Sequence, residues 1–271
     1  GISAVAVLTL ALGIGATTAL FNVVYAVVID PFPQKGSDRL ISIRLVPRTG
    51  PPGGVFLTAR QLSDLRRSPV VDDAIAMDSF VTTLTGGDVP EVLRTDFYSG
   101  NGLAYFGVRP ELGRIFTEAD APPGEEPRHV VVLTHAFWQT HFGSRPDVIG
   151  QTLHLDQVPY TVIGVAPPRF LNGSDIIVPI HLRLDPAYAW GVQTRLKPGV
   201  GPAAAEAALQ PLFEAFAKES PSRFPRDFRV QVTRLLDGRR AAAFVPTLSL
   251  VFAAAAVLLL IACVTTSILL L

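Results

Sequence analysis

Two long runs without a charged residue, one at each end of the chain, constrain the fold most. Residues 2–29 contain no Asp, Glu, Lys or Arg, and neither do residues 241–271. A transmembrane helix needs roughly 20 consecutive, mostly apolar residues. All 23 basic and 23 acidic residues lie between Asp30 and Arg240. The sequence therefore predicts transmembrane helices over residues 1–30 and 241–271, flanking one water-soluble domain over residues 31–240.

A cleaved signal peptide is the main alternative for the first run. The apolar core of such a peptide has about 7–15 residues and leads to a cleavage site of small residues. This run is about twice that length, and it ends in the bulky residues Val27, Val28 and Ile29. We therefore expect a retained helix. Because the chain starts with Gly and stops within an apolar run, we expect a fragment of a longer membrane protein, with the second span truncated.

Small residues recur at every fourth position of the first run. Ala11, Gly15 and Ala19 have this spacing, which allows another helix to approach closely within a bilayer. The same spacing is frequent by chance in alanine-rich spans. These three residues are the candidate helix-packing site of the chain.

The central segment has the pattern of an α+β domain. Residues 39–46 alternate polar and apolar, as in a half-buried strand, and Thr58 with Gln61 predicts a capping box at a helix start. Two extended stretches, 74–85 and 89–97, follow around a hairpin-type turn. Further on, the patterns predict strands at 130–133, 152–156, 160–165, 175–184, 192–196 and 228–235, a helix from Thr134 to Gly143, and a helix over 203–218 that Pro211 should kink or split.

This order of elements predicts two subdomains with mixed sheets. An inserted subdomain would span roughly residues 88–185, and the remainder would comprise residues 36–87 and 186–238. Glycines at predicted turns and helix ends, among them Gly107, Gly113, Gly143, Gly150 and Gly164, are expected where positive φ or close backbone approach is needed.

The sequence contains no recognisable catalytic motif. A phosphate-binding loop requires Lys followed by Ser or Thr, whereas Lys35, Lys197 and Lys218 precede Gly, Pro and Glu. His-Glu-x-x-His and Gly-x-Ser-x-Gly are also absent. His135 and His141 are six residues apart, on different faces of the predicted helix, so we expect no shared metal. We expect a protein that is not an enzyme and has no cofactor, and its zero net charge does not suggest nucleic acid as a partner.

Several segments resemble the MacB-type periplasmic core domain of the FtsX-like permeases of ABC transporters. The likeness covers nearly the whole chain in order and is nearest to the duplicated permeases that lack a fused ATPase. Residues 264–266 depart from the usual pattern, which contains Asn. The matching segments are residues 9–16, 105–117, 132–138, 142–143, 148–153, 159–168, 195–200 and 260–263.

The resemblance implies a permease subunit of a bacterial inner (cytoplasmic) membrane, with several spans and the large domain in the periplasm. It implies an ABC-type ATPase acting in trans, a dimer or internally duplicated permease, and a periplasmic adaptor as a further candidate partner. ATP hydrolysis would move the periplasmic domain in an export or mechanotransmission system. Arg239 and Arg240, on the domain side of the second run, oppose this orientation under the positive-inside rule. The alternatives are an extracytoplasmic sensor and an FtsX-like regulator of a cell-wall hydrolase.

Overall fold

The computed structural model describes residues 15, 18, 36–87, 89–168, 170 and 173–235. Both predicted spans lie outside these residues, except for Gly15 and Thr18. Gly15 is helical and exposed, whereas Ala11 and Ala19, the other members of the predicted packing site, lie outside. Within the described ranges no helix is both long enough and apolar enough to cross a membrane. The two spans and the packing site therefore stay predictions.

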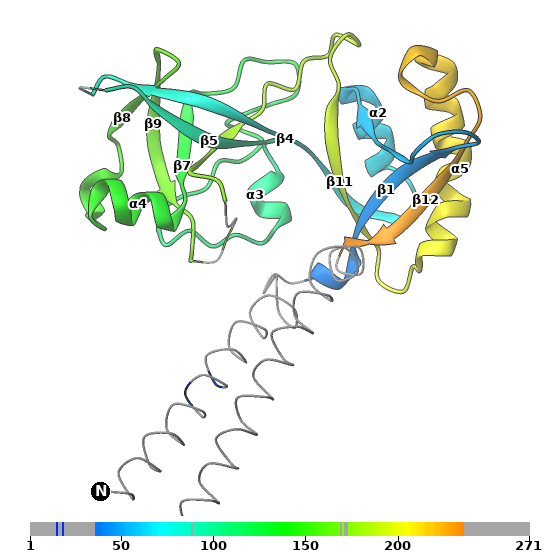
Figure 1. Ribbon diagram of the computed structural model, residues 1–271, viewed down its shortest axis with the longest axis horizontal. Helices are drawn as coiled ribbons and strands as arrows, with labels where there is room; N and C mark the ends of the chain where they lie inside the picture. Colours follow the sequence, from blue (N-terminus) through cyan, green and yellow to red (C-terminus); the bar gives the residue numbers. More distant parts are fainter. Residues whose placement is uncertain are drawn as a thin grey trace, which may run out of the picture. The chain divides into compact units, whose positions relative to one another are not determined.

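The described strands form one continuous mixed sheet (Figure 1). Its order is β12-β1-β11-β4-β5-β10-β7-β9-β6, with β2 beside β1, β3 beside β11, and β8 paired with both β4 and β9. The pairs β5–β10 and β7–β9 are parallel, and the other pairs are antiparallel. The strands are β1 (Leu40–Pro47), β2 (Gly53–Gly54), β3 (Phe56–Leu57), β4 (Val71–Thr85), β5 (Glu91–Tyr98), β6 (Leu112–Gly113), β7 (Val130–Leu133), β8 (Thr152–Leu155), β9 (Val158–Val165), β10 (Ile176–Pro179), β11 (Trp190–Leu196) and β12 (Phe228–Arg234).

The α+β class with mixed strand pairing is as predicted, and the strands of both halves of the domain belong to one sheet. The reason is the length of β4, which has 15 residues. Its first half, from Val71 to Met77, pairs with β11, and its second half, from Met77 to Leu84, pairs with β5. One strand therefore joins the hydrogen-bond ladders of both halves of the domain.

Except for α3, the α-helices of the domain begin and end close to where local sequence signals place them. They are α2 (Ala59–Arg66), α3 (Gly102–Tyr105), α4 (His135–Phe142) and α5 (Pro202–Glu219). At the start of α2 the Gln61 amide donates to the Thr58 hydroxyl, at 3.3 Å, and the Thr58 amide donates to the Gln61 side chain, at 3.2 Å. This reciprocal pair confirms the predicted capping box. At the end of α4, Gly143 has a φ of 56°, the left-handed cap that glycine favours.

One core lies between the sheet and helices α2 and α5. Ile43 and Leu45 of β1 pack there with Leu65 of α2 and Leu209 and Phe213 of α5. We call this the first core.

Pro211 lies inside α5 without splitting it, contrary to one of the two predicted outcomes. The buried residues on either side of the proline pack in the first core, which keeps the helix continuous. Pro211 has no amide hydrogen to donate to the Ala207 carbonyl. Because Ala207 is exposed, this carbonyl is accessible to water instead.

Helix α5 also covers the free edge of β12, which ends the sheet order. The amides of Val230 and Val232 point away from β1 and donate to the side chains of Gln210, at 2.7 Å, and Glu206, at 2.8 Å. The Gln210 amide in turn donates to the Phe228 carbonyl at 3.2 Å. Two side chains of α5 thus accept hydrogen bonds from the backbone amides with which another strand would pair.

A second core lies around β7, β9, β10 and α4. Val131, Leu133, Val162 and Ile176 are fully buried there, and Trp138 of α4 packs on them. The sequence predicts a strand over residues 175–184, but the observed strand β10 is shorter and ends at Pro179. The chain then leaves the second core, since Ile180 and Leu182 belong to the first.

Candidate functional site

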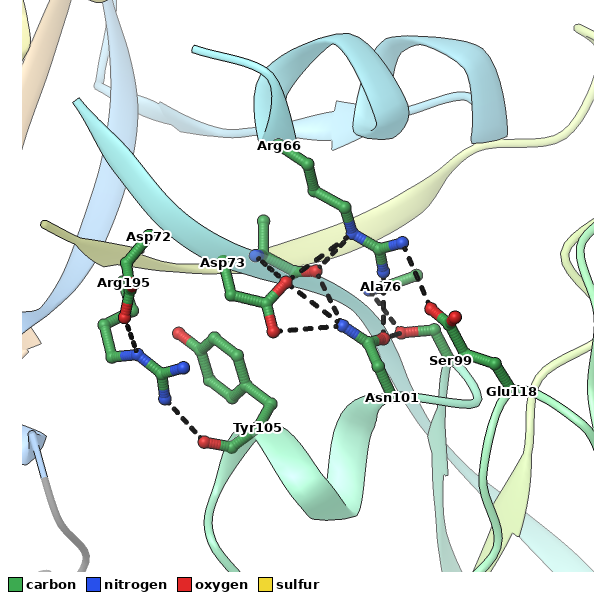
Figure 2. A network of polar contacts seen from close by, with 10 residues as sticks. Arg66, Asp72, Asp73, Ala76, Ser99, Asn101, Tyr105, Glu118 and Arg195 are labelled. Atoms are coloured by element: carbon green, nitrogen blue, oxygen red, sulfur yellow. Dashed lines mark hydrogen bonds and ion pairs between the residues drawn. The ribbon is translucent and has the colours of Figure 1, made fainter. Parts of the chain in front are cut away.

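The two cores meet where β4 changes partners, and a polar network lies at this junction. Met77 is paired with Gly191 of β11 and with Tyr98 of β5. Phe97, next to Tyr98 in the chain, is partly buried and packs against both cores. The polar side chains around this point come from α2, β4, β11 and the turn between β5 and α3 (Figure 2).

Asn101 and Arg66 tie α2 and the turn before α3 to the first residues of β4. Arg66, the last residue of α2, donates to the Asn101 side-chain oxygen at 2.9 Å and to the Ala74 carbonyl at 2.7 Å. The Asn101 amide donates to both oxygens of Asp73, at 3.2 and 3.3 Å. Glu118 lies 3.7 Å from the Arg66 guanidinium. Every polar atom of the Asn101 amide is therefore engaged (Figure 2).

Ser99 connects the same turn to β4 through hydrogen bonds of its backbone and its side chain. The Ser99 amide donates to the Ala76 carbonyl at 3.0 Å, and the Ala76 amide donates to the Ser99 hydroxyl at 3.1 Å. The hydroxyl donates to Asn101 at 2.7 Å. Ser99 is almost fully buried, so these bonds satisfy groups that would otherwise carry a desolvation cost.

Asp72 forms the second half of the network, between two arginines. Its carboxylate accepts from Arg195 at 2.8 Å and from Arg39 at 3.1 Å. Arg195 also donates to the Tyr105 carbonyl at 2.6 Å, and its guanidinium carbon lies 4.5 Å from the centre of the Tyr105 ring. The hydrogen bond from Arg195, assisted by Arg39, holds the pKa of Asp72 below its usual value. Asp72 thus joins residues from the start of the domain, the end of β11 and α3.

The carboxylates of the network are paired with arginines or held by amides. Asp72 is paired with Arg39 and Arg195, and Asp73 accepts from the Asn101 amide. Within the described part of the chain, no group of three or more His, Cys, Asp or Glu residues could hold a metal ion. His135 and His141 contact different glutamates, Glu111 at 2.6 Å and Glu91 at 3.0 Å.

Sequence reasoning missed the junction. Asp72 and Asp73 were part of an unremarkable stretch, and α3 was not predicted at all. The one usable signal was the succession Ser99-Gly100-Asn101-Gly102 directly after a strand, a composition that favours turns in which side chains bond to the backbone.

The predicted special glycines are placed as expected. Gly107, Gly113 and Gly150 have φ values of 68°, 65° and 88°. At Gly164, where φ is not positive, an added Cβ would lie only 2.1 Å from the Arg114 carbonyl oxygen. These positions are explained by the backbone, without any ligand.

The segment that contains Arg114 is stabilised by a buried carboxylate. Asp120 is 3% exposed and accepts from the Arg114 guanidinium through both oxygens, at 2.7 and 2.9 Å, and from the Thr117 amide at 3.0 Å. The hydrogen bonds from Arg114 lower the pKa of Asp120, and burial opposes them less strongly.

Replacing Asp120 with Asn should lower stability at pH 7 by about 1–2 kcal/mol, because the Arg114 pair and its charge are lost. A carboxyl group with a lowered folded-state pKa stabilises the fold above its usual pKa of 3.8 and loses that effect as pH falls through the lowered value. The difference between wild type and variant, measured by urea unfolding, should therefore shrink below about pH 4. Glu125→Gln, at an exposed residue, is the control. A difference that stays constant with pH would contradict the ionic origin.

Three solved structures have folds similar to that of this chain. The periplasmic region of MacB from Actinobacillus actinomycetemcomitans aligns with a TM-score of 0.57 and 17% identity, covering 77% of this chain and 95% of that one. The extracellular domain of the noncanonical ABC-type transporter YknZ from Gram-positive bacteria aligns with a TM-score of 0.54 and 14% identity, covering 72% and 99%. A domain of a permease protein from Porphyromonas gingivalis aligns with a TM-score of 0.52 and 16% identity, covering 74% and 92%.

The α+β fold of this chain is thus the fold of the MacB and YknZ domains. The sequence matches the MacB-like periplasmic core domain family over residues 3–212. The chain belongs to this family, which confirms the resemblance drawn from the sequence. A search of curated protein sequences returns no match.

Proposed function

We propose that this chain is part of a multi-pass permease in the bacterial inner membrane, with its large domain in the periplasm. A separate cytoplasmic ATPase would hydrolyse ATP, and the chain itself would catalyse no reaction. The family match and the similar folds support the periplasmic domain. The charge-free runs at residues 2–29 and 241–271 support the spans.

In this proposal the permease moves its periplasmic domain in response to the ATPase, and the Asp72 pair carries the movement. Arg39 belongs to the short helix Ser37–Arg39, which follows the first predicted span. Asp72 joins Arg39 to Arg195, and Arg195 contacts the last residue of α3, Tyr105. A displacement at the start of the domain is thereby passed to α3 at the junction of the cores. This set of contacts is the observation that carries the proposal.

The partners follow from the same reasoning. A permease with a single copy of this domain would act as a dimer, and a longer one would contain the domain twice. A periplasmic adaptor would receive the movement of the domain. Rigid elements with two packed arrangements are the usual means by which such a displacement is transmitted.

The test is Asp72→Ala in the full-length permease, reconstituted with its ATPase in nanodiscs. Spin labels at the exposed residues Gln139 and Lys218, in a Cys263→Ser background, report the separation of α4 and α5. We expect a nucleotide-dependent change of this distance in the wild type and its loss in Asp72→Ala, with the ATPase rate preserved.

Asp64→Ala is the matched control, because Asp64 pairs with Arg67 at 2.9 Å at the end of α2 and joins no other element among the described residues. This variant should behave as the wild type does. Absence of a nucleotide-dependent distance change in the wild type would contradict the function. A change that persists in Asp72→Ala would contradict only the role of the Asp72 pair.

A further inference from the structure

The ribbon of β1 and β12 has one face in the first core and an opposite, outer face. Ile43 and Leu45 of β1 are buried in the first core. Successive residues of a strand point to opposite faces, so Arg44 and Val46 point away from that core. On β12, Gln231 is paired with Arg44, and Arg229 is paired with Val46.

Three arginines cluster on this outer face. Arg44 and Arg48 precede and follow Val46 by two residues, so both are diagonal neighbours of Arg229. Side chains in diagonal positions on one face are about 7–8 Å apart. The ladder extends to Arg48, whose amide donates to the Asp227 carbonyl at 3.3 Å.

These arginines have no carboxylate partner within the described ranges. Arg44, Arg48 and Arg229 are exposed, and none of them forms an ion pair with any residue that the structure describes. The neighbouring carboxylate of Asp227 also forms none with those residues. Like charges this close repel one another, and an anionic partner would relieve that repulsion.

An exposed aromatic ring lies beside the arginines. Leu57 of β3 is buried in the first core, and the preceding residue, Phe56, is 58% exposed on the opposite side. A Cβ on Gly54 would lie 3.9 Å from a ring carbon of Phe56, and Gly54 is paired with Arg44. The ring is thus separated from Arg44 only by a strand without side chains.

We propose that Arg44, Arg48, Phe56 and Arg229, which we call the arginine face, form the docking surface for an acidic segment of a partner protein. Guanidinium groups bind carboxylates through paired hydrogen bonds, and Phe56 offers an apolar contact for a side chain of the partner. Arginines and aromatic residues are enriched in protein interfaces in this way. This inference does not depend on the proposed transport function.

A lipid surface fits the arginine face less well. At about 3.3 Å per residue, Arg48 lies roughly 26 Å along β1 from Leu40, the first strand residue after the predicted span. The line of arginines therefore runs along the strand, away from the point at which the chain enters the domain.

The test measures binding of a fluorescent twelve-residue peptide of repeating Glu-Glu-Leu to the full chain in nanodiscs of phosphatidylcholine. The variant is the triple substitution R44Q/R48Q/R229Q. The matched control is R60Q/R94Q/R109Q, three exposed arginines that form no ion pair in the described ranges. We expect the first triple to weaken binding by about tenfold or more, and the control triple to retain wild-type affinity.

Two further comparisons separate the possible occupants. A neutral Gln-Gln-Leu peptide should not bind, and Phe56→Ala should weaken the Glu-Glu-Leu peptide but not a peptide of Glu alone. The proposal is overturned if the wild type does not bind the acidic peptide or if both triples lose binding equally. It is also overturned if phosphatidylglycerol vesicles bind the wild type through the same three arginines more tightly than the peptide does.

Discussion

Gly164→Ala is expected to destabilise the second core by about 3 kcal/mol or more. Gly164 is buried in β9, and its added Cβ would lie 2.1 Å from the Arg114 carbonyl oxygen and 3.0 Å from the carbonyl carbon. The obstacle is backbone that is itself held by the hydrogen bond from the Arg114 amide to the Ile163 carbonyl at 2.8 Å. It cannot move without breaking the pairing of β6 with β9. Urea unfolding followed by Trp138 fluorescence measures the loss.

Gly87→Ala is the control for this substitution. Gly87 is exposed, its φ is not positive, and nothing described lies within 4 Å of the added Cβ. The free energy of unfolding of Gly87→Ala should match that of the wild type within about 0.5 kcal/mol. Equal urea midpoints for Gly164→Ala and Gly87→Ala would contradict the close approach of the Arg114 backbone to Gly164.

Phe97→Ala is expected to uncouple the unfolding of the two cores and to cost about 2–3 kcal/mol. Phe97 is partly buried and packs against both cores. The two tryptophans of the chain report one core each, because Trp138 lies in the second and Trp190 packs on the first. In single-tryptophan variants, the urea midpoints should coincide for the wild type and separate for Phe97→Ala.

Phe80→Ala serves as the comparison, since the Phe80 ring meets Phe97 edge-on at 6.0 Å and is 61% exposed. Removing it should cost less than about 1 kcal/mol and leave the two midpoints together. Coincident midpoints in Phe97→Ala would mean that β4 and its hydrogen bonds couple the cores without this ring.

Local sequence signals predicted most elements of the fold correctly. Thr58 with Gln61 placed the start of α2, Gly143 placed the end of α4, and strict alternation identified β1. These signals depend on neighbours within a few residues, which a sequence states directly. The family resemblance, carried by motifs such as residues 105–117, identified the class of protein from the amino-acid sequence alone.

The junction could not be predicted because its contacts join residues far apart in the chain. Asp72 meets Arg195 across 123 positions, and no local pattern marks either residue. The joining of both halves in one sheet could not be predicted for a related reason, since alternation identifies β4 as a strand but not the residue at which its partner changes. The end of β10 depended on which core would bury Ile180, a tertiary choice.

Because α5 covers the edge of β12, copies of this protein at high local concentration cannot pair at that edge. An unprotected strand edge allows the sheets of neighbouring molecules to pair. Gln210 and Glu206 already occupy the donors at that edge. Copies of this domain at high local concentration therefore cannot merge their sheets through the β12 edge.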